Sequence, residues 1–341
     1  MLRYFRQNDP LKVFGLIVLL LLTRLVYFIF LSDQILEVQS SLNLSNSFSE
    51  NTGPLFSSIE FLLSYVLSNE IVNVTLASVL LLYNSTHINK ILIRNSAFEE
   101  NTYIPAALYI ILSSFSETNY FLGASLLGSS FIIIGLGYLL QHLRYRSSDS
   151  IVLSLGFCIG LATLTDTSYF WFLILVVLIF VFYSKTVTRR YLLLLWGFIF
   201  SLLVAWLVFF YQDAGQLFWQ KLGESIFTFN TNGDWLIRIG IILGLPILLS
   251  LAMIFNNLGG IGKTNLQITI KNVFSWLFFV GSMSIVLQGN ESFSAGLILI
   301  IPMSYFLTDW LLTIERKWLA EILLVTLIVS FIALQFFGPL Y

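Results

Sequence analysis

Long apolar runs alternate with short polar stretches along the whole chain of 341 residues. Most runs are about 17–22 residues long, enough for a helix to cross a hydrocarbon core of about 30 Å. The pattern predicts an all-α, polytopic bundle of about 11 transmembrane helices. The expected spans are 12–32, 71–88, 103–116, 120–141, 150–164, 168–184, 191–211, 235–256, 272–288, 293–313 and 318–337.

Two polar stretches between these runs contain segments that mix apolar and polar residues. Segments 54–67 and 217–229, in the first and fourth outer loops, have the composition of helices that lie in the membrane interface. Residues 54–67 also suit a short spanning helix, so that alternative stays open. We favour the interfacial helix, because a spanning one would place Glu70 and Asn73 in a tight inner turn without a basic residue.

The basic residues lie in clusters that recur after every second apolar run. The clusters are Arg3/Arg6/Lys12, Lys90/Arg94, Arg144/Arg146, Lys185/Arg189/Arg190, Lys263/Lys271 and Arg316/Lys317. Only Arg24, Lys221 and Arg238 fall elsewhere among the seventeen Lys and Arg residues. By the positive-inside rule, this spacing predicts a cytoplasmic N-terminus and a periplasmic C-terminus.

Composition agrees with an integral membrane protein, since 57% of the residues are hydrophobic and only 10% are charged. We expect a multi-pass protein of the inner, cytoplasmic membrane with membrane lipid as its surroundings. No loop is long enough for a soluble unit, so residues 1–341 form one expected domain. No basic stripe lies outside the short loops, which argues against nucleic acid. The single cysteine, Cys158, excludes an intrachain disulfide.

Small residues spaced by four mark two of the predicted helices. The pairs are Gly156/Gly160 and Gly240/Gly244. Such pairs let two helices approach closely. We expect both pairs to pack within this chain, in preference to forming a seam between two copies. Asn84 begins an N-x-S/T pattern, but its expected place inside the membrane gives that pattern no weight as a glycosylation site.

Arg24 lies inside the first apolar run, about 12 Å below its outer end at a rise of about 1.5 Å per residue. A cation at that depth costs about 3 kcal/mol or more unless it is paired or reaches the interface. It is therefore expected to face the bundle interior. It either binds an anion such as a lipid phosphate or makes a structural bond to another helix.

Acidic residues at the outer ends of the helices are the candidates for chemistry. Asp33 follows the first helix, and Glu117 begins a tight outer turn. Two carboxylates at the boundary between membrane and water can supply a general base and a second base or metal ligand. Asp166 is a third candidate, in another outer turn. All three also fit ordinary solvated turn residues. Lys221 and Arg238 are outer cations that could hold a lipid phosphate.

The stretches "RYFRQNDPLK", "HINKILIRNSAFEENTYIPAALYIILSSF" and "RRYLLLLWGFIFSLLVAWLVFFY" resemble an uncharacterised multi-pass inner-membrane family of Bacteroidota. This likeness covers most of the chain and carries no catalytic signature. It implies a fold but no activity.

The layout of the chain resembles the GT-C class of glycosyltransferases, which use polyprenyl-phosphate-linked sugars. The shared features are a cytoplasmic N-terminus, a long first outer loop with an interfacial helix, tight outer turns, and a second long outer loop. The resemblance implies Asp33 and Glu117 as catalytic acids, although neither belongs to a paired-acid motif. It also implies a lipid-linked sugar bound near Arg24, Lys221 or Arg238. A non-catalytic scaffold of an envelope complex and a transporter are the alternatives. No cofactor is indicated.

Overall fold

The structure is a computed structural model, and it is helical along most of the chain that it describes. It describes residues 2–6, 11–25, 53–59, 69–115, 117–145, 148–184, 187–211, 234–256, 264–288 and 296–314, with short pieces at 213, 215–216, 218–219, 222–223, 318, 321–322, 324–326 and 329. No extended β-strand occurs within these residues. The all-α prediction is therefore confirmed for this part, while the count of spans and the sides of the two termini stay predictions.

The described part contains five helices long and apolar enough to cross a membrane. They are α4 (Glu70–Arg94), α6 (Ala124–Tyr145), α9 (Thr188–Tyr211), α12 (Asn265–Gln288) and α13 (Gly296–Thr313). The other elements are α1 (Leu2–Phe5), a helix at 12–25, a short helix at 54–59, α5 (Ile104–Ser113), η1 (Glu117–Tyr120), α7 (Asp149–Thr165), η2 (Thr167–Tyr169), α8 (Phe170–Ile179), η3 (Phe180–Ser184) and α11 (Asp234–Asn256). The chain is a membrane protein.

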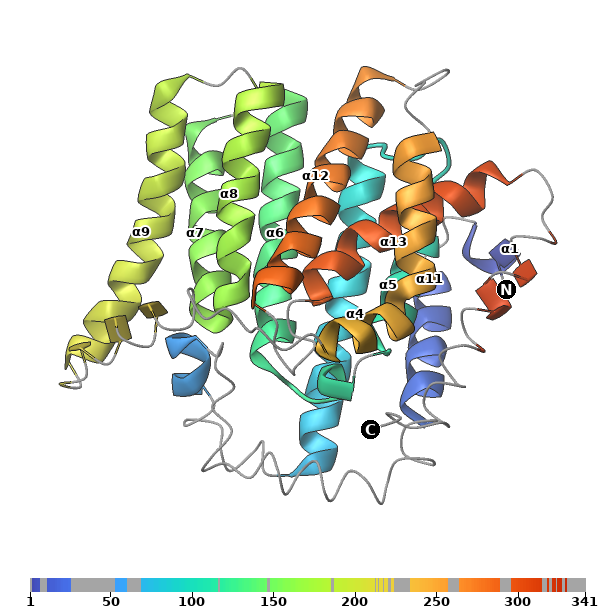
Figure 1. The fold of residues 1–341 in the computed structure, drawn as a ribbon, viewed down its shortest axis with the longest axis horizontal. Coiled ribbons are helices and arrows are strands. Elements are labelled where there is room, and N and C mark those ends of the chain that lie inside the picture. The colour runs from blue at the N-terminus through green and yellow to red at the C-terminus, as the bar shows by residue number, and fades with distance from the viewer. Residues whose placement is uncertain are drawn as a thin grey trace.

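The helices form two groups that meet in the middle of the molecule. α6, α7, α8 and α9 stand side by side on one flank, and α7 packs against both α6 and α9 (Figure 1). In the other group α13 crosses the molecule at a steep tilt and packs against α5, α11 and α12 (Figure 1). α13 is buried over most of its length, and every residue of α5 is buried.

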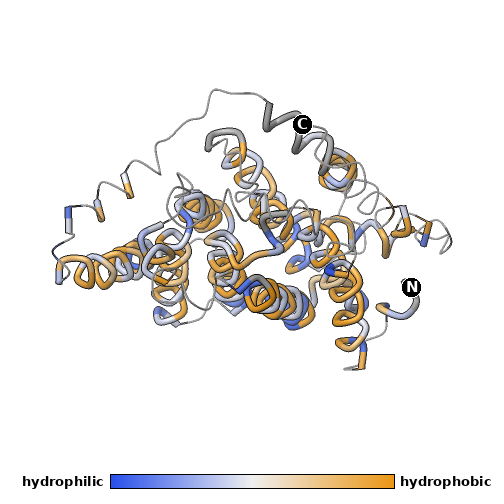
Figure 2. Tube along the Cα trace, turned by 90° about the horizontal axis from the view of Figure 1, so that it is seen from below, coloured by the Kyte–Doolittle hydropathy of each residue, from blue (hydrophilic) through white to orange (hydrophobic). Residues whose placement is uncertain are grey.

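Apolar side chains cover the outside of the bundle as well as its inside. Hydrophobic residues follow most of the helices along their length (Figure 2). α9 is the clearest case, because it exposes Trp196, Leu203 and Leu207, which lie on the opposite face of the helix from Leu194 and Gly197, the residues that contact α7. A soluble protein rarely leaves so large an apolar face uncovered. This face is suited to contact with lipid tails.

Small residues allow α7 and α9 to touch along their backbones. A Cβ atom at Gly156 would lie 3.0 Å from both the carbonyl carbon of Leu194 and the nitrogen of Phe198. A Cβ atom at Gly197 would lie 2.9 Å from the nitrogen of Phe157. The prediction that the Gly156 pair packs within the chain is confirmed.

The same prediction is wrong for the second glycine pair, as far as the described residues go. A Cβ atom at Gly240 or at Gly244 would meet no atom of them within 4 Å. α11 bends along this half before it rises beside α13 (Figure 1). The spacing of small residues alone therefore does not identify a helix contact, because the partner must also present a close backbone.

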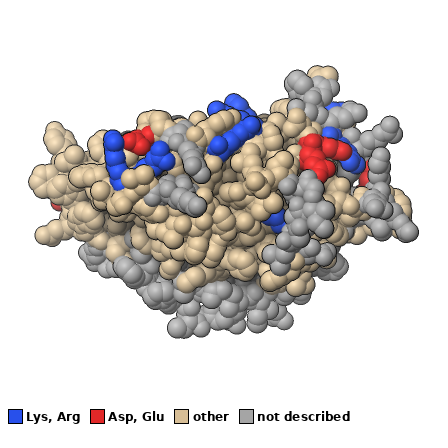
Figure 3. Space-filling view, turned by 90° about the horizontal axis from the view of Figure 1, so that it is seen from above, with Lys and Arg blue, Asp and Glu red and all other residues tan. Residues whose placement is uncertain are grey.

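One end of the bundle carries most of the described basic residues. Arg144 donates a hydrogen bond through Nη1 to the carbonyl oxygen of Arg94, which joins the ends of α6 and α4. Arg189 Nη2 lies 3.1 Å from Asp149 Oδ2, and Arg190 Nε lies 3.4 Å from Asp149 Oδ1. Figure 3 looks onto this end and shows the Lys and Arg side chains gathered there. This is the end that the charge pattern predicts to be cytoplasmic.

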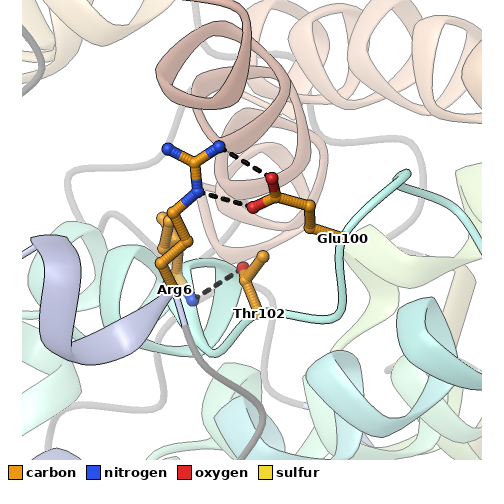
Figure 4. A network of polar contacts seen from close by, with 4 residues as sticks. Arg6, Glu100 and Thr102 are labelled. Atoms are coloured by element: carbon orange, nitrogen blue, oxygen red, sulfur yellow. Dashed lines mark hydrogen bonds and ion pairs between the residues drawn. The ribbon is translucent and has the colours of Figure 1, made fainter. Parts of the chain in front are cut away.

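The N-terminal residues are tied to the loop between α4 and α5 at the same end. Arg6 forms a two-pronged ion pair with Glu100, with Nε–Oε2 at 2.5 Å and Nη2–Oε1 at 2.8 Å (Figure 4). The backbone nitrogen of Tyr103 donates to the carbonyl oxygen of Phe5 at 2.8 Å. Thr102 lies beside Arg6 in this cluster (Figure 4). The N-terminus therefore shares the side of the α4–α5 loop.

The start of α12 corrects one predicted boundary. The helix begins at Asn265 and not at 272, so Lys271 lies within it and is only 7% exposed. Thr264 and Gln267 form a capping box: the Thr264 nitrogen donates to Gln267 Oε1 at 2.9 Å, and the Gln267 nitrogen donates to Thr264 Oγ1 at 3.3 Å. These bonds satisfy backbone donors of the first turn. Lys271 donates through Nζ to the carbonyl oxygen of Met253 and was wrongly assigned to a loop.

The two expected interfacial helices are only partly described. Residues 54–59 are helical, while the rest of 54–67 and most of 217–229 lie outside the described residues. The Gly53 nitrogen donates to the carbonyl oxygen of Thr165 at 2.8 Å, which attaches this short helix to the C-terminal end of α7. Its interfacial position stays a prediction.

Candidate functional site

Arg24 is a buried cation near the end of the helix at 12–25. The residue is 5% exposed. Its Nη2 donates a hydrogen bond to the carbonyl oxygen of Asn119 at 3.0 Å, and its Cζ lies 4.3 Å from the centre of the Tyr120 ring. The face of an aromatic ring attracts a guanidinium electrostatically. The prediction that Arg24 faces the protein interior is confirmed.

The turn that Arg24 contacts, η1, is fixed by hydrogen bonds from its own side chains. Asn119 Nδ2 donates to the carbonyl oxygen of Ser113 at 3.0 Å, and the Tyr120 hydroxyl donates to that of Ser114 at 3.2 Å. Both bonds reach back to the end of α5, to its last residue and its C-cap, whose carbonyls have no partner within the helix. The turn therefore offers Arg24 a fixed surface.

Glu117 is the first residue of this same turn, η1. Its side chain lies outside the described part of the structure, so no contact of its carboxylate can be stated. The backbone alone places two sequence-predicted residues together, because Arg24 bonds to the third residue of the turn that Glu117 begins. Segments far apart in the sequence thus meet at one end of the bundle.

Asp166 lies in the turn between α7 and α8 and is 2% exposed. Its Oδ1 accepts a hydrogen bond from the Ser168 nitrogen at 2.9 Å, and its Oδ2 accepts one from the Ser125 hydroxyl. Asp166 therefore caps η2 and links α6 to the turn. The expected turn is confirmed, whereas the alternative that Asp166 is a solvated surface residue is wrong.

Burial and hydrogen bonding act in opposite directions on the Asp166 carboxyl. Burial raises its pKa above the usual value, since the charged form loses its hydration. The bonds from Ser125 and Ser168 favour the charged form and lower the pKa in part. The net result is a raised pKa, so this carboxyl holds its proton to higher pH than an exposed aspartate.

η1 and the turn at Asp166 both lie beside the first residues of α6. Arg24 contacts residues 119 and 120, just before α6 begins at Ala124, and Asp166 contacts Ser125, the second residue of α6. These contacts lie at the end of the bundle opposite the basic cluster (Figure 1). Arg24, the Glu117 turn and Asp166 thus form one candidate site at the helix ends that the charge pattern predicts to be outer.

The structure does not test the remaining predicted site residues. Asp33 and Lys221 lie outside the described residues. The backbone of Arg238 belongs to α11, but its side chain is not described. The assignment of Asp33 and Glu117 as catalytic acids, and of Lys221 and Arg238 as phosphate ligands, remains prediction.

Buried polar residues inside the bundle were missed by the sequence reasoning. Asn84 of α4 and Ser129 of α6 are fully buried and joined by a hydrogen bond of 3.1 Å from Asn84 Nδ2 to Ser129 Oγ. Lys271 and Asp309 are also buried, at 7% and 6% exposed. A signal was available for Asn84, because an amide in an apolar helix needs a hydrogen-bonding partner.

The arrangement provides a fixed cation beside a turn that begins with an acid. A buried guanidinium can bind a phosphate or carboxylate through several N–H donors at once. Among the described residues, no three His, Cys, Asp or Glu side chains gather where they could hold a metal ion. Anion binding at Arg24 stays a prediction, as does a purely structural role, for which the structure shows the bond to Asn119.

Comparisons with known proteins place the chain in a family. The model of DUF6427, a family of unknown function, matches residues 45–340. Searches of the curated proteins and of the solved structures find no match to this chain. The matched region includes the turns at Glu117 and Asp166 and extends through every helix from α4 onward, so the chain belongs to the DUF6427 family.

Proposed function

We propose that this protein works in envelope glycan assembly, as a GT-C-like enzyme of the inner membrane. It would bind a polyprenyl-phosphate-linked sugar at the outer, periplasmic ends of its helices. The single observation that supports this is the position of Arg24: a buried guanidinium rests on the turn that Glu117 begins. A phosphate-binding cation next to an acid is the combination that such a transfer needs.

The proposed reaction divides the work among three residues. Asp33 takes the proton of an acceptor hydroxyl, whose oxygen attacks the anomeric carbon of the sugar as the bond from that carbon to the phosphate oxygen breaks. Arg24 balances the negative charge that develops on the leaving phosphate. Glu117 orients the acceptor. Lys221 and Arg238 would hold the outer phosphate oxygens, and Asp166 would fix the neighbouring turn.

A ligand-binding experiment tests the phosphate site. The full chain is placed in nanodiscs, and its thermal stability is followed with and without polyprenyl phosphate or uncharged polyprenol. A ligand at one hundred times its Kd stabilises a protein by about 2.7 kcal/mol. We expect the phosphate to stabilise wild type but not Arg24→Gln, and polyprenol to stabilise neither. Arg144→Gln, at the opposite end of the bundle, is the matched control and should keep the response.

Equal stabilisation of wild type and Arg24→Gln by polyprenyl phosphate would refute the site. The catalytic part is tested separately, with transfer of a radiolabelled sugar from a lipid carrier as the readout. Asp33→Asn keeps the volume of the side chain and removes the base, so the protein level should stay unchanged while transfer is lost. Full transfer by Asp33→Asn would exclude that role.

A non-catalytic role in a membrane complex is the second candidate. The observation that favours it is that polar side chains at these turns bond to the protein itself. Asp166 accepts from the Ser168 nitrogen and the Ser125 hydroxyl, and Asn119 donates to a backbone carbonyl of α5. In that case Arg24 is a structural link between the helix at 12–25 and η1. Arg24→Gln would then lower stability with and without the phosphate lipid, and polyprenyl phosphate would not stabilise wild type.

A further inference from the structure

One face of α4 changes from apolar to basic along the length of the helix. Val79 and Tyr83 are 67% and 46% exposed on this face. Lys90 and Arg94, in the last turns of the helix, are exposed as well. Residues spaced by four and seven lie on the same side of a helix. We name Tyr83, His87, Lys90 and Arg94, which follow this spacing, the α4 stripe.

The helix α6 packs on a different face of α4 and leaves the α4 stripe uncovered. Asn84 Nδ2 donates to Ser129 Oγ at 3.1 Å, and a Cβ atom at Gly137 would lie 3.2 Å from Ile91 Cδ1. Asn84 and Ile91 each follow a stripe residue by one position, which is a rotation of about 100° around the axis at 3.6 residues per turn. In a membrane the exposed stripe therefore faces lipid.

The two cations of the α4 stripe differ from the arginines at the start of α9. Arg189 and Arg190 both pair with Asp149. Lys90 and Arg94 form no such pair with any acid of the described residues. Figure 3 shows one group of basic side chains at the rim of this end without an acidic side chain next to it. Basic residues beside the membrane surface attract anionic lipid headgroups.

Two stacked rings continue the α4 stripe toward the middle of the bundle. The centres of the Tyr83 and His87 rings are 5.5 Å apart and their planes differ by 17°. His87 is half-buried, and its imidazole makes no hydrogen bond within the described part of the chain. It lies three residues before Lys90, which is about 4.5 Å along the axis. Rings with one polar group are typical of the zone between headgroups and acyl chains.

The dimensions of the α4 stripe match the layers of a phospholipid. A bilayer about 40–45 Å thick with a hydrocarbon core of about 30 Å has a polar zone of about 5–8 Å on each side. Lys90 and Arg94 are four residues apart, which is about 6 Å along the axis. With these two residues at the level of the headgroup phosphate, His87 lies at the level of the glycerol esters. Tyr83 then lies beside the first acyl carbons.

We propose that the α4 stripe binds one anionic phospholipid of the surrounding bilayer. Arg94 donates two parallel hydrogen bonds to the phosphate oxygens, and the Lys90 ammonium contacts the same group. The His87 N–H donates to an acyl ester carbonyl, and the Tyr83 ring packs on the acyl chain. In a bilayer that contains such lipid the site is already filled, so it is separate from the polyprenyl-phosphate site proposed at Arg24. The inference is independent of the enzymatic activity.

Lipid titration followed by native mass spectrometry tests the charge of the occupant. The full chain in neutral detergent receives phosphatidylglycerol, the zwitterionic phosphatidylcholine or inorganic phosphate. We expect one phosphatidylglycerol to bind in preference to the other two. Lys90→Gln and Arg94→Gln should each weaken its binding about fivefold, and the double variant about 25-fold. Arg189→Gln, an exposed arginine at the same end, is the matched control and should bind as wild type does.

Three outcomes of the titration would overturn the proposal. They are equal binding of phosphatidylglycerol and phosphatidylcholine, wild-type affinity in the double variant, and displacement of the lipid by inorganic phosphate at the same concentration. The last would show a site for simple anions. Arg94→Lys is the conservative variant: it keeps the charge but loses the two-pronged geometry, so it should bind more tightly than Arg94→Gln.

Ester-linked and ether-linked phosphatidylglycerol test the place of the lipid on the stripe. The ether lipid has the same headgroup and charge but no ester carbonyl. A net hydrogen bond is worth about fivefold in affinity, so wild type should prefer the ester lipid by about that factor. His87→Phe keeps the stacked ring and removes the N–H donor, so it should bind both lipids alike. An unchanged preference in His87→Phe would overturn the assignment of His87 to the ester.

Discussion

The contact between α7 and α9 predicts opposite outcomes for the same substitution at two glycines. Gly156→Ala adds a methyl group that would lie 3.0 Å from the Leu194 carbonyl carbon and the Phe198 nitrogen, whereas ordinary contact begins at 3.4 Å. These are backbone atoms that cannot rotate away, so α9 must move outward. Gly240→Ala adds its methyl group where no described atom lies within 4 Å.

The expected magnitudes follow from two opposing terms. Overpacking in a well-packed contact costs about 1–3 kcal/mol, and backbone atoms put Gly156→Ala at the upper end of that range. Replacing glycine by alanine within a helix gains about 1 kcal/mol. Gly156→Ala should therefore lose about 2 kcal/mol, and Gly240→Ala should gain up to about 1 kcal/mol. The difference of about 3 kcal/mol is about a hundredfold in the unfolding equilibrium.

The chain carries its own probe for this comparison. Cys158 is the only cysteine, is buried, and lies between Gly156 and Gly160 on α7. Its reaction with a thiol-specific fluorescent dye during heating reports when this part of α7 becomes accessible. Gly156→Ala should lower the temperature of that reaction, and Gly240→Ala should not. Equal lowering by both variants would refute the claim that backbone contact between α7 and α9 causes the loss.

Three further outcomes are expected. Because burial raises the pKa of Asp166, the folded protein binds the proton of this carboxyl more tightly than the unfolded chain does, so stability falls as pH rises from the usual value of 3.8 through the raised one. Asp166→Asn should flatten this fall in thermal scans between acidic and neutral pH. An unchanged pH profile would contradict the expectation. Arg6→Ala should cost less than about 1 kcal/mol and less still at high salt, because the Glu100 pair is partly exposed; a larger, salt-independent loss measured by the same dye would show another role. Reporter fusions at Arg144, in the last turn of α6, should score cytoplasmic, and those at Asp213, just after α9, periplasmic, since the C-terminal ends of α6 and α9 lie at opposite ends of the bundle (Figure 1). The same score for both would refute the topology.

Most helix positions could be predicted from the apolar runs, because a run of that length is a property of the local sequence. α9 and α6 begin and end within a few residues of the expected bounds. The start of α12 was also encoded locally, in the capping box of Thr264 and Gln267. The prediction placed it too late because Lys271 was assumed to lie in a loop. The ammonium group of a buried helical lysine can still be stabilised by donating a hydrogen bond to a carbonyl oxygen of a neighbouring helix, as that of Lys271 does.

The candidate site could be predicted only in part. The inward orientation of Arg24 follows from the cost of a cation in lipid, and the structure agrees. Its contact with the Asn119 turn could not be predicted, because it joins residues far apart in sequence. The burial of Asp166 was missed for the same reason: its partner Ser125 belongs to another helix, and a turn in isolation gives no sign that its carboxyl will be covered.

The position of α13 constrains the order in which the protein can be completed. α5 is buried along its whole length, and α13 is one of the helices that cover it. During synthesis α5 leaves the ribosome long before α13, so that side of α5 stays uncovered until the last described long helix arrives. With ten residues, α5 is only about 15 Å long at 1.5 Å per residue, too short to span lipid unaided. The C-terminal part of the chain is therefore needed to stabilise a segment made near its beginning, and a ribosome that stops before residue 296 releases a bundle with an unfilled centre.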